Sequence, residues 1–281
     1  MLATTDAAGT LDLTQAPPAP SSRRRVAAIA RNTFREAVRD RVLYNLVLFV
    51  LLLSVSAIFL GAASASQDAK IIVDLGLSAM LLFGAFIAIF VGVGLVWKEI
   101  ERRTLYAIFA KPVGRGEFLL GKYLGLCLTL AVNVVVMGAG VSLVLFYVVS
   151  RGAAPLLAAL WLTIALIYLE LSLLTAVALL FSSFSSPVFS AFGSVALFVI
   201  GHFTADLKGF ATLFDAAAAK GLLLALYYGL PNLSTFSRIT AAAHGIAPPV
   251  AHVLGALAYA VAWDVALLAA AALLFARRDF K

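Results

Sequence analysis

Long apolar runs, separated by short polar segments, dominate the chain. Runs of this kind lie at about 42–63, 71–97, 120–149, 155–181, 187–204 and 251–276. A helix needs about 20 apolar residues to cross a bilayer. The pattern therefore predicts an all-α, polytopic membrane protein in which residues 42–281 form one transmembrane domain of six helices.

The residues before the first run show two different patterns. Residues 1–22 contain three prolines and no long apolar stretch, so we expect a disordered cytoplasmic tail and no signal peptide. Residues 23–41 alternate at helical spacing, with Arg31, Arg35 and Arg39 on one stripe and apolar side chains opposite. This pattern is typical of an amphipathic helix on anionic lipid; the alternative is a solvated helix face beside a span.

Composition and charge agree with a membrane protein. Of all residues, 63% are hydrophobic and 12% are charged, which excludes an ordinary soluble enzyme and a disordered chain. Sixteen of the 21 Lys and Arg residues lie in 23–41, in 98–122 or after residue 276. The positive-inside rule then places both termini in the cytoplasm of a cell with a plasma (inner) membrane, which we expect to be bacterial. We expect no nucleic-acid partner.

Residues 98–122 lie between the second and third spans on the cytoplasmic side. The pattern predicts a helix that Pro112 ends, a turn at Gly114 and Gly116, and a second helix with Glu117 in its first turn. Apolar residues such as Leu105 and Phe109 would lie outside the bilayer, which favours a binding surface; the alternative is a basic loop that only sets topology.

A partial phosphate-binding motif occurs in the same region. Residues 116–122 read GEFLLGK, the first seven positions of a P-loop, but Tyr123 stands where Ser or Thr should hold magnesium. No strand precedes the motif. We therefore expect no nucleotide-binding or catalytic site in this chain, and no cofactor.

Residues 205–250 form the long segment on the outer side. Its apolar part, residues 221–230, is too short to cross a bilayer and ends at Pro231, with Tyr227 and Tyr228 suited to an interface. We expect a pair of short re-entrant or interfacial helices; the alternative is a loop with one helix lying flat.

Two carboxylates fall near the middle of predicted spans. Glu170 and Asp264 would each cost about 2.5–3.5 kcal/mol there if charged. We expect them to be protonated or to bond with Asn133 or Thr163. Their role is either a cavity or proton-linked site, or an interhelical bond that holds the bundle. His202, Asp206 and His244 lie toward the outer side, and we expect no metal site.

Small residues recur every fourth position in two spans. Gly84, Ala88 and Gly92 form one such stripe, and Gly121 and Gly125 form another. Small side chains let helices approach closely, so these stripes predict packing faces.

Several motifs resemble one family. The run from Trp97 to Leu105, the segment from Lys111 to Phe118, and the pair Gly121-Lys122 are similar to the ABC-2 type permease subunits of ATP-binding-cassette transporters. Pro231-Asn232 and the C-terminal FARRD also fit, and the branch with the nitrous-oxide-reductase maturation permease is the most similar. Arg103 stands where the family usually has glycine.

The resemblance implies a six-span half of a dimeric exporter, with a second permease copy, two cytoplasmic ATPase subunits that carry ATP and Mg, and membrane lipid as partners. The coupling element, residues 98–119, would dock the ATPase, and Tyr227, Tyr228, Pro231 and Asn232 would gate the outer side. The implied coupling residues are Lys98, Glu99, Glu101, Arg102, Arg103, Thr104, Leu105, Tyr106, Phe109, Lys111, Pro112, Arg115 and Glu117. A stand-alone proton-coupled carrier that uses Glu170 and Asp264 is the alternative.

Overall fold

The computed structural model describes residues 21–39, 48, 49, 52, 68–101, 114–148, 153–211 and 217–277. Every regular element in these ranges is helical. The helices, in chain order, are α1 (Ser22–Ala37), α3 (Asp68–Phe86), the π-helical turn η3 (Ile87–Val91), α4 (Gly92–Glu101), α6 (Arg115–Val148), α7 (Ala153–Phe184), α8 (Pro187–Ala211), α9 (Ala217–Gly229), the 3-10 turn η4 (Leu233–Phe236), α10 (Ile239–Ala243) and α11 (Val250–Arg277). Residues 1–20, most of the first predicted span and the segment 102–113, within the predicted coupling element, lie outside the described residues.

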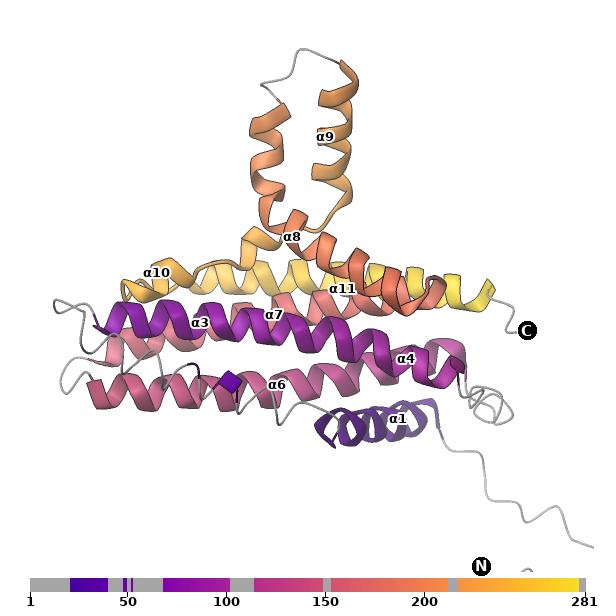
Figure 1. Cartoon of the computed structure of the whole chain (residues 1–281), viewed down its shortest axis with the longest axis horizontal. Helices are drawn as coiled ribbons and strands as arrows, with labels where there is room; N and C mark the ends of the chain where they lie inside the picture. Colours follow the sequence, from indigo (N-terminus) through magenta and orange to yellow (C-terminus); the bar gives the residue numbers. More distant parts are fainter. Residues whose placement is uncertain are drawn as a thin grey trace, which may run out of the picture.

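Five described stretches are long and apolar enough to cross a membrane. They are Ala69–Leu95, Arg115–Tyr147, Pro155–Phe184, Pro187–Thr204 and Val250–Phe275. Each overlaps one of the last five predicted spans. A helix satisfies its own backbone hydrogen bonds, which is what a segment surrounded by hydrocarbon requires. Figure 1 shows α3–α4, α6, α7 and α11 running along one long axis, so these helices form a bundle.

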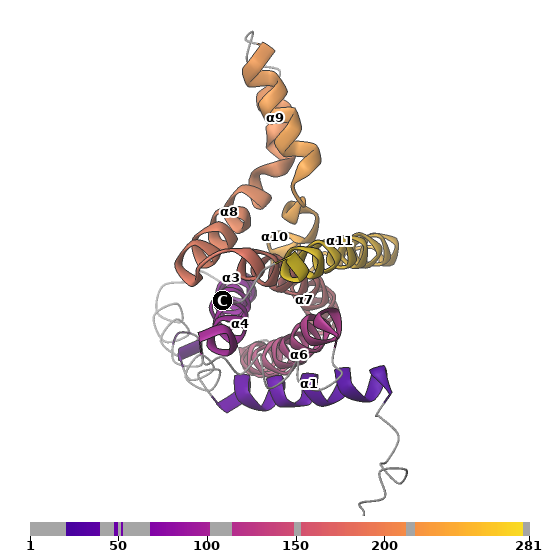
Figure 2. The ribbon, with the colours of Figure 1, turned by 90° about the vertical axis from the view of Figure 1, so that its right-hand side faces the viewer.

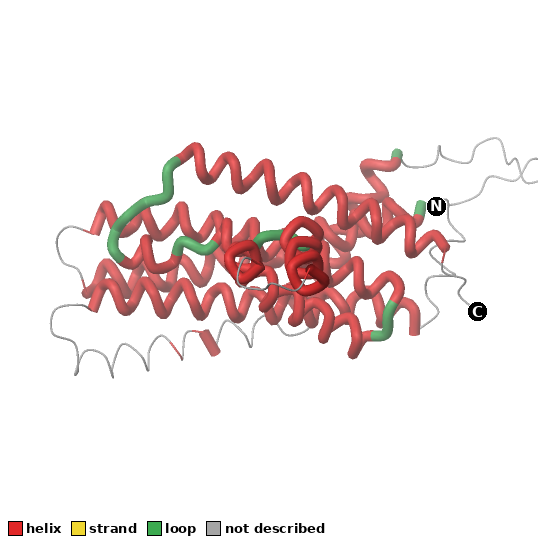
Figure 3. The backbone as a smooth tube through the Cα atoms, turned by 90° about the horizontal axis from the view of Figure 1, so that it is seen from above, coloured by secondary structure: helices red, strands yellow, loops and turns green. Residues whose placement is uncertain are grey.

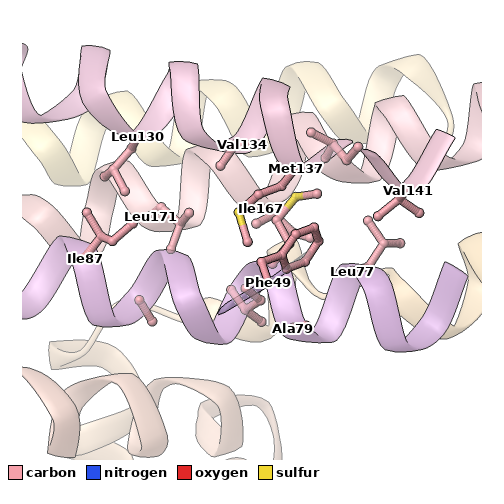
Figure 4. Close-up of a cluster of buried hydrophobic side chains, with 14 of the residues drawn as sticks. Phe49, Leu77, Ala79, Ile87, Leu130, Val134, Met137, Val141, Ile167 and Leu171 are labelled. Carbon is pink, nitrogen blue, oxygen red and sulfur yellow. The ribbon is translucent and has the colours of Figure 1, made fainter. Parts of the chain in front are cut away.

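The core of the bundle lies between α3, α6 and α7. Leu77, Val134 and Leu171 belong to one buried apolar cluster that these three helices share (Figure 4). In the most apolar 18-residue stretch of α7, 72% is buried inside the chain. In the corresponding stretches of α8 and α11, only 22% is buried. Helices α8 and α11 are therefore peripheral, and much of their apolar surface faces outward.

The glycines of α3 and α4 are close-packing positions, as their spacing indicates. A Cβ atom on Gly84 would lie 2.4 Å from the side chain of Leu171 on α7. A Cβ atom on Gly92 would lie 3.3 Å from Ala178 on the same helix. The π-helical turn η3 separates the two glycines and adds a residue to the helical turn between them.

Helix α1 lies across one end of the bundle. Figure 2 looks along the bundle and shows α1 crossing beneath α6, at a steep angle to the long axis. Its contact face includes Thr33 and Ala37, both buried. Gly121 and Gly125 of α6 receive this face, because a Cβ atom on either would lie within 2.7 Å of an atom of α1. The second glycine stripe therefore packs against α1 and not against another span.

Helices α8 and α9 leave the bundle together. Helix α8 begins alongside the other helices and then turns away, and α9 returns beside it (Figure 1). Figure 3 shows both helices end-on near the middle of the bundle's length. We call the C-terminal part of α8, up to Ala211, together with α9 the hairpin. After it, η4 and α10 lead to α11, which runs the length of the bundle.

Candidate functional site

The predicted coupling element lies at the end of the bundle where α4 stops and α6 starts, which we call the coupling end. Lys98, Glu99 and Glu101 lie in α4, whereas Arg115 and Glu117 lie in the first turn of α6. The other implied coupling residues lie outside the described residues; these are Arg102, Arg103, Thr104, Leu105, Tyr106, Phe109, Lys111 and Pro112. The described part thus consists of the two helix ends that flank the segment 102–113.

Glu117 connects three parts of the coupling end. Its two carboxylate oxygens accept hydrogen bonds from Nε and Nη2 of Arg25 on α1, at 2.9 and 2.7 Å. The same carboxylate accepts a bond from the backbone N–H of Gly114 at 3.2 Å, which satisfies a free donor at the start of α6. A bidentate arginine–carboxylate pair has a defined geometry. The carboxylate also raises the pKa of Arg25, so this guanidinium stays charged.

Two further contacts join the coupling end to its neighbours. Nη1 of Arg115 donates to the backbone carbonyl of Phe275 on α11, at 3.0 Å. Nζ of Lys122 lies 3.8 Å from Oε2 of Glu36 on α1, and the Lys122 side chain is almost fully buried. The start of α6 is therefore held to α1 on one side and to the end of α11 on the other.

The interior carboxylate of α11 lies in a polar cluster between three helices. Oδ2 of Asp264 accepts a hydrogen bond from the Tyr123 hydroxyl at 2.7 Å and one from the Ser172 hydroxyl at 3.2 Å. The other oxygen of Asp264 has no hydrogen-bond partner among the described residues. Tyr123 belongs to α6 and Ser172 to α7, so this cluster crosslinks the bundle.

The interior carboxylate of α7 has a histidine beside it. Oε1 of Glu170 lies 3.1 Å from Nε2 of His202 on α8. The two atoms lie within ion-pair distance, and the contact is charged on the histidine side only if His202 is protonated; neither oxygen of Glu170 has a hydrogen-bond partner of regular geometry among the described residues. The Glu170 side chain is 1% exposed, whereas the His202 side chain is 25% exposed. The histidine is therefore the side of this pair that the surroundings can reach.

The expected partners of the two carboxylates were wrong. The side-chain amide of Asn133 and the hydroxyl of Thr163 are buried and have no hydrogen-bond partner among the described residues. Tyr123, Ser172 and His202 take their place. Sequence spacing does not give the rotation of one helix relative to another, and the Tyr123 position was informative only as a departure from a P-loop. His202 already lies in the fifth predicted span, 187–204, but the spacing gives no sign that it contacts Glu170.

The predicted outer-gate residues lie where the hairpin returns to the bundle. Pro231 is buried, and the side chain of Asn232 accepts a bond from the backbone N–H of Ser234 at 3.1 Å, which caps η4. The hydroxyl of Tyr259 on α11 accepts from the Asn232 N–H at 2.8 Å. Tyr227 and Tyr228 meet edge to face on α9, with ring centroids 4.9 Å apart.

The sequence of this chain is similar to those of known transport proteins. Residues 27–280 match the profile of the ABC-2 family transporter proteins. A probable ABC transporter permease protein NosY of Pseudomonas aeruginosa is 31% identical over 268 residues, which cover 90% of this chain and 96% of that protein. A probable ABC transporter permease protein NosY of Stutzerimonas stutzeri is 30% identical over 112 residues, 38% of this chain and 41% of that protein.

The resemblance inferred from the motifs is confirmed. The apolar helices and the matches together make this a multi-pass membrane protein, the permease subunit of an ABC transporter and not a catalytic enzyme. The chain belongs to the ABC-2 transporter family.

Proposed function

We propose that the chain is half of an exporter, in which two permease copies form the substrate pathway and two cytoplasmic ATPase subunits, with ATP and Mg, drive it. Both termini would be cytoplasmic, with six spans. The observation that carries this proposal is the construction of the coupling end. The ends of α4 and α6 flank the segment 102–113, and three polar contacts join the start of α6 to α1 and α11.

The mechanical role follows from these contacts. A push on the segment 102–113 reaches α4 and α6 directly, because both helices begin or end beside it. Through Glu117 the push also reaches α1, and through Arg115 it reaches the end of α11. Four elements would then move together when the ATPase changes shape. Charged and apolar groups in the segment suit a surface that must bind tightly enough to transmit force.

Helix α1 would lie on the inner leaflet. Its face away from α6 exposes Arg24, Arg31 and Arg35, and basic residues on an amphipathic helix attract anionic lipid. Its steep angle to the bundle axis places it along the membrane plane if the axis follows the membrane normal (Figure 2).

The second permease copy is supported by the outward faces of the peripheral helices. On α8, Val188, Phe189 and Phe192 are each more than 70% exposed in the single chain. Lipid or a second copy would cover this surface. Six spans form half of the pathway in the family that the chain resembles, so we propose a homodimer.

A double substitution in the coupling element, at the end of α4 and in the segment that follows it, tests the proposal. Glu101→Ala with Leu105→Ala should weaken ATPase binding or uncouple ATP hydrolysis from transport, because truncations at the centre of an interface often cost about 2 kcal/mol or more. Membrane insertion should persist, since neither residue is basic. Pull-down of the ATPase and its turnover would be compared with the unmodified chain.

The matched control is Lys70→Ala with Asp74→Ala, at the opposite end of the same helical segment. Both residues are exposed on α3, and this variant should bind and transport normally. Wild-type binding and transport by the Glu101/Leu105 variant would show that the coupling element takes no part in the mechanism.

The isolated chain, purified without any ATPase subunit, should hydrolyse no ATP.

A stand-alone proton-coupled carrier is the second candidate, and the Glu170–His202 contact favours it. A carboxylate beside a histidine within a span can hold and release a proton. Proton-driven uptake by the purified chain alone, without any ATPase, would support this candidate.

A further inference from the structure

We propose that Glu170 and His202 form a proton-dependent latch that holds the root of the hairpin to the core. The latch itself rests on contacts within this chain, whereas its effect on transport rests on the proposed function. His202 lies on α8 close to the point where the helix leaves the bundle. Thr204, two residues later, is still buried, and Gly209 is exposed.

The tautomer of His202 follows from its neighbours. Nδ1 lies 2.9 Å from the backbone carbonyl oxygen of Phe198. A carbonyl oxygen only accepts hydrogen bonds, so the tautomer that makes this bond carries its hydrogen on Nδ1. The other nitrogen, Nε2, therefore carries a lone pair in the neutral ring and a hydrogen in the charged ring. Only Nε2 faces Glu170.

The contact between Nε2 and Glu170 requires a proton. If the carboxyl group is protonated and the ring neutral, the acid hydrogen faces the Nε2 lone pair. If the proton has moved to the ring, a carboxylate faces an imidazolium. A further proton leaves the ring N–H facing a carbonyl-type oxygen, which is still attractive. When the shared proton leaves and the ring keeps its hydrogen on Nδ1, a buried carboxylate faces a lone pair and the two acceptors repel. Moving that hydrogen to Nε2 would relieve the repulsion only by breaking the bond to the Phe198 carbonyl.

Any proton exchange of the pair must pass through His202, since its side chain is partly exposed in the single chain whereas that of Glu170 is enclosed. Other ionisable groups on the surrounding elements are Tyr168 on α7, Tyr123 and Cys127 on α6, and Asp264, Tyr259 and His252 on α11. Helix α9 adds Lys220, Tyr227 and Tyr228, and the described part of α3 and α4 has none between Asp74 and Lys98. None of these lies within ion-pair distance of Glu170 or His202 in the described ranges. Helix α8 itself also carries Asp206 and Lys208, four and six positions after His202 in the sequence.

The root of the hairpin is otherwise held mainly from its returning side. Gly201 packs against the side chain of Leu233, where a Cβ atom would be 2.7 Å from Leu233 Cγ. The Asn232–Tyr259 bond fixes the returning segment to α11, and a His252 nitrogen lies 3.1 Å from the Thr235 carbonyl oxygen. Release of Glu170 would remove this polar contact from the outgoing part of the hairpin on α8, which then keeps packing contacts such as Gly201 against Leu233, while the returning part keeps its hydrogen bonds. The hairpin would then swing about η4.

The test measures the hairpin directly in the full-length permease in lipid nanodiscs, without ATPase or substrate. Spin labels at Lys220 on α9 and Asp74 on α3, in a Cys127→Ala background diluted with unlabelled chain, report the hairpin distance as pH rises. Labels at Asp74 and Tyr147, both within the bundle, are the reference pair. The wild-type chain should gain a displaced population at alkaline pH, by about tenfold or more, whereas the reference distance stays constant.

Substitutions separate a proton-dependent latch from ordinary packing. Glu170→Gln keeps an N–H that can donate to Nε2 and has no proton to lose, so the hairpin should stay in place at every pH. Glu170→Leu and His202→Phe should show the displaced population at every pH. Asp264→Asn should respond to pH as the wild type does, which excludes the other interior carboxylate as the cause.

Three results would overturn the latch. These are an unchanged hairpin in both Glu170→Leu and His202→Phe, the same alkaline displacement in Glu170→Gln as in the wild type, or a wild-type distance that does not respond to pH. Transport with the ATPase present is measured separately. If the hairpin is the gate, the ratio of wild-type to Glu170→Gln transport rises with pH; a constant ratio beside a working latch would count against the gate and leave the latch standing.

Discussion

Single polar side chains decide how the interior of this bundle is held together. Asp264 receives hydroxyl hydrogen bonds from Tyr123 on α6 and Ser172 on α7, so one carboxylate contacts two other helices. Interhelical hydrogen bonds in membranes contribute about 0.6 kcal/mol on average, because the separated helices also find partners in the bilayer. A bond to a buried acid between three helices should lie at the upper end of that range.

We therefore predict that Tyr123→Phe lowers the free energy of unfolding by about 1–2 kcal/mol. The phenyl ring keeps the packing, so the loss reports the hydroxyl group. Asp264→Asn should be milder, since its amide oxygen still accepts from Tyr123. Thermal unfolding of the purified permease in detergent measures both.

A double substitution provides the control. Asp264→Leu alone leaves the Tyr123 hydroxyl without this acceptor, whereas Tyr123→Phe with Asp264→Leu removes donor and acceptor together. The double variant should be more stable than the sum of the two single losses predicts. Strictly additive losses would show that the two groups do not interact.

Residue pairing was the part that sequence reasoning could least supply. The amino-acid types at 170 and 264 were enough to identify two unusual positions, because acids in apolar runs are rare and costly. Their partners depend on how far α7, α8 and α11 are rotated about their axes and on the turn in α8. A single chain's residue order contains no direct measure of either, so Asn133 and Thr163 were chosen over Tyr123 and His202.

At the scale of elements, the last five predicted spans agree within about five residues with the long apolar helices of the structure, whereas most of the first, 42–63, lies outside the described residues. The run 71–97 corresponds to Ala69–Leu95, and 251–276 corresponds to Val250–Phe275. This agreement has a physical cause, since bilayer thickness sets the length of an apolar helix. The lateral hairpin was less accessible, because Pro231 indicates where α9 ends but not which way it points.

For helix α1 as well, the sequence predicted the element but not the helix against which it packs. Its arginine stripe indicated a surface helix, and the spacing of Gly121 and Gly125 indicated a close packing face, but nothing in the sequence linked the two. In the structure a Cβ atom on Gly125 would lie 2.5 Å from the carbonyl oxygen of Ala30. The backbone of α1 therefore occupies the space that any side chain at position 125 would need.

This close approach predicts that Gly125→Ala displaces α1. Backbone cannot move aside as a flexible side chain can, so overpacking of about 1–3 kcal/mol is expected. Hydrogen exchange of the Ser22–Ala37 amides should increase while α7 stays protected. Gly140→Ala, on the same helix, is the matched control because no atom of another described helix lies within 4 Å of its added Cβ. Equal protection of α1 in both variants would contradict the docking of α1 on α6.

At the scale of the whole molecule, the apolar surface is unevenly distributed. Helices α3 and α7 are mostly buried within the chain, whereas α8 and α11 present most of their apolar windows outward. Such a one-sided distribution suits a subunit that is completed by a partner or by lipid. A second permease copy and membrane lipid are both parts of the proposed assembly.

Native mass spectrometry of the complex purified from membranes should therefore show two permease copies with two ATPase copies. Retained lipid should accompany this assembly, given the exposed arginines of α1. Removal of lipid by harsher detergent is the control, because it should strip lipid before it separates the permease copies. A complex with one permease copy that still transports would contradict the homodimer.

The contacts of the coupling end also determine the order in which the chain can be completed during synthesis. Arg25 is translated early, but its carboxylate partner Glu117 lies 92 residues later in the chain. Phe275, whose carbonyl oxygen accepts from Arg115, lies 160 residues after that arginine. Chains are built from the N-terminus, so α1 must wait at the membrane surface until α6 has been inserted. The last helix to be made then closes the end at which the ATPase is proposed to bind. A chain still being translated would therefore present an unfinished docking end, so the ATPase would engage completed permeases in preference to partial ones.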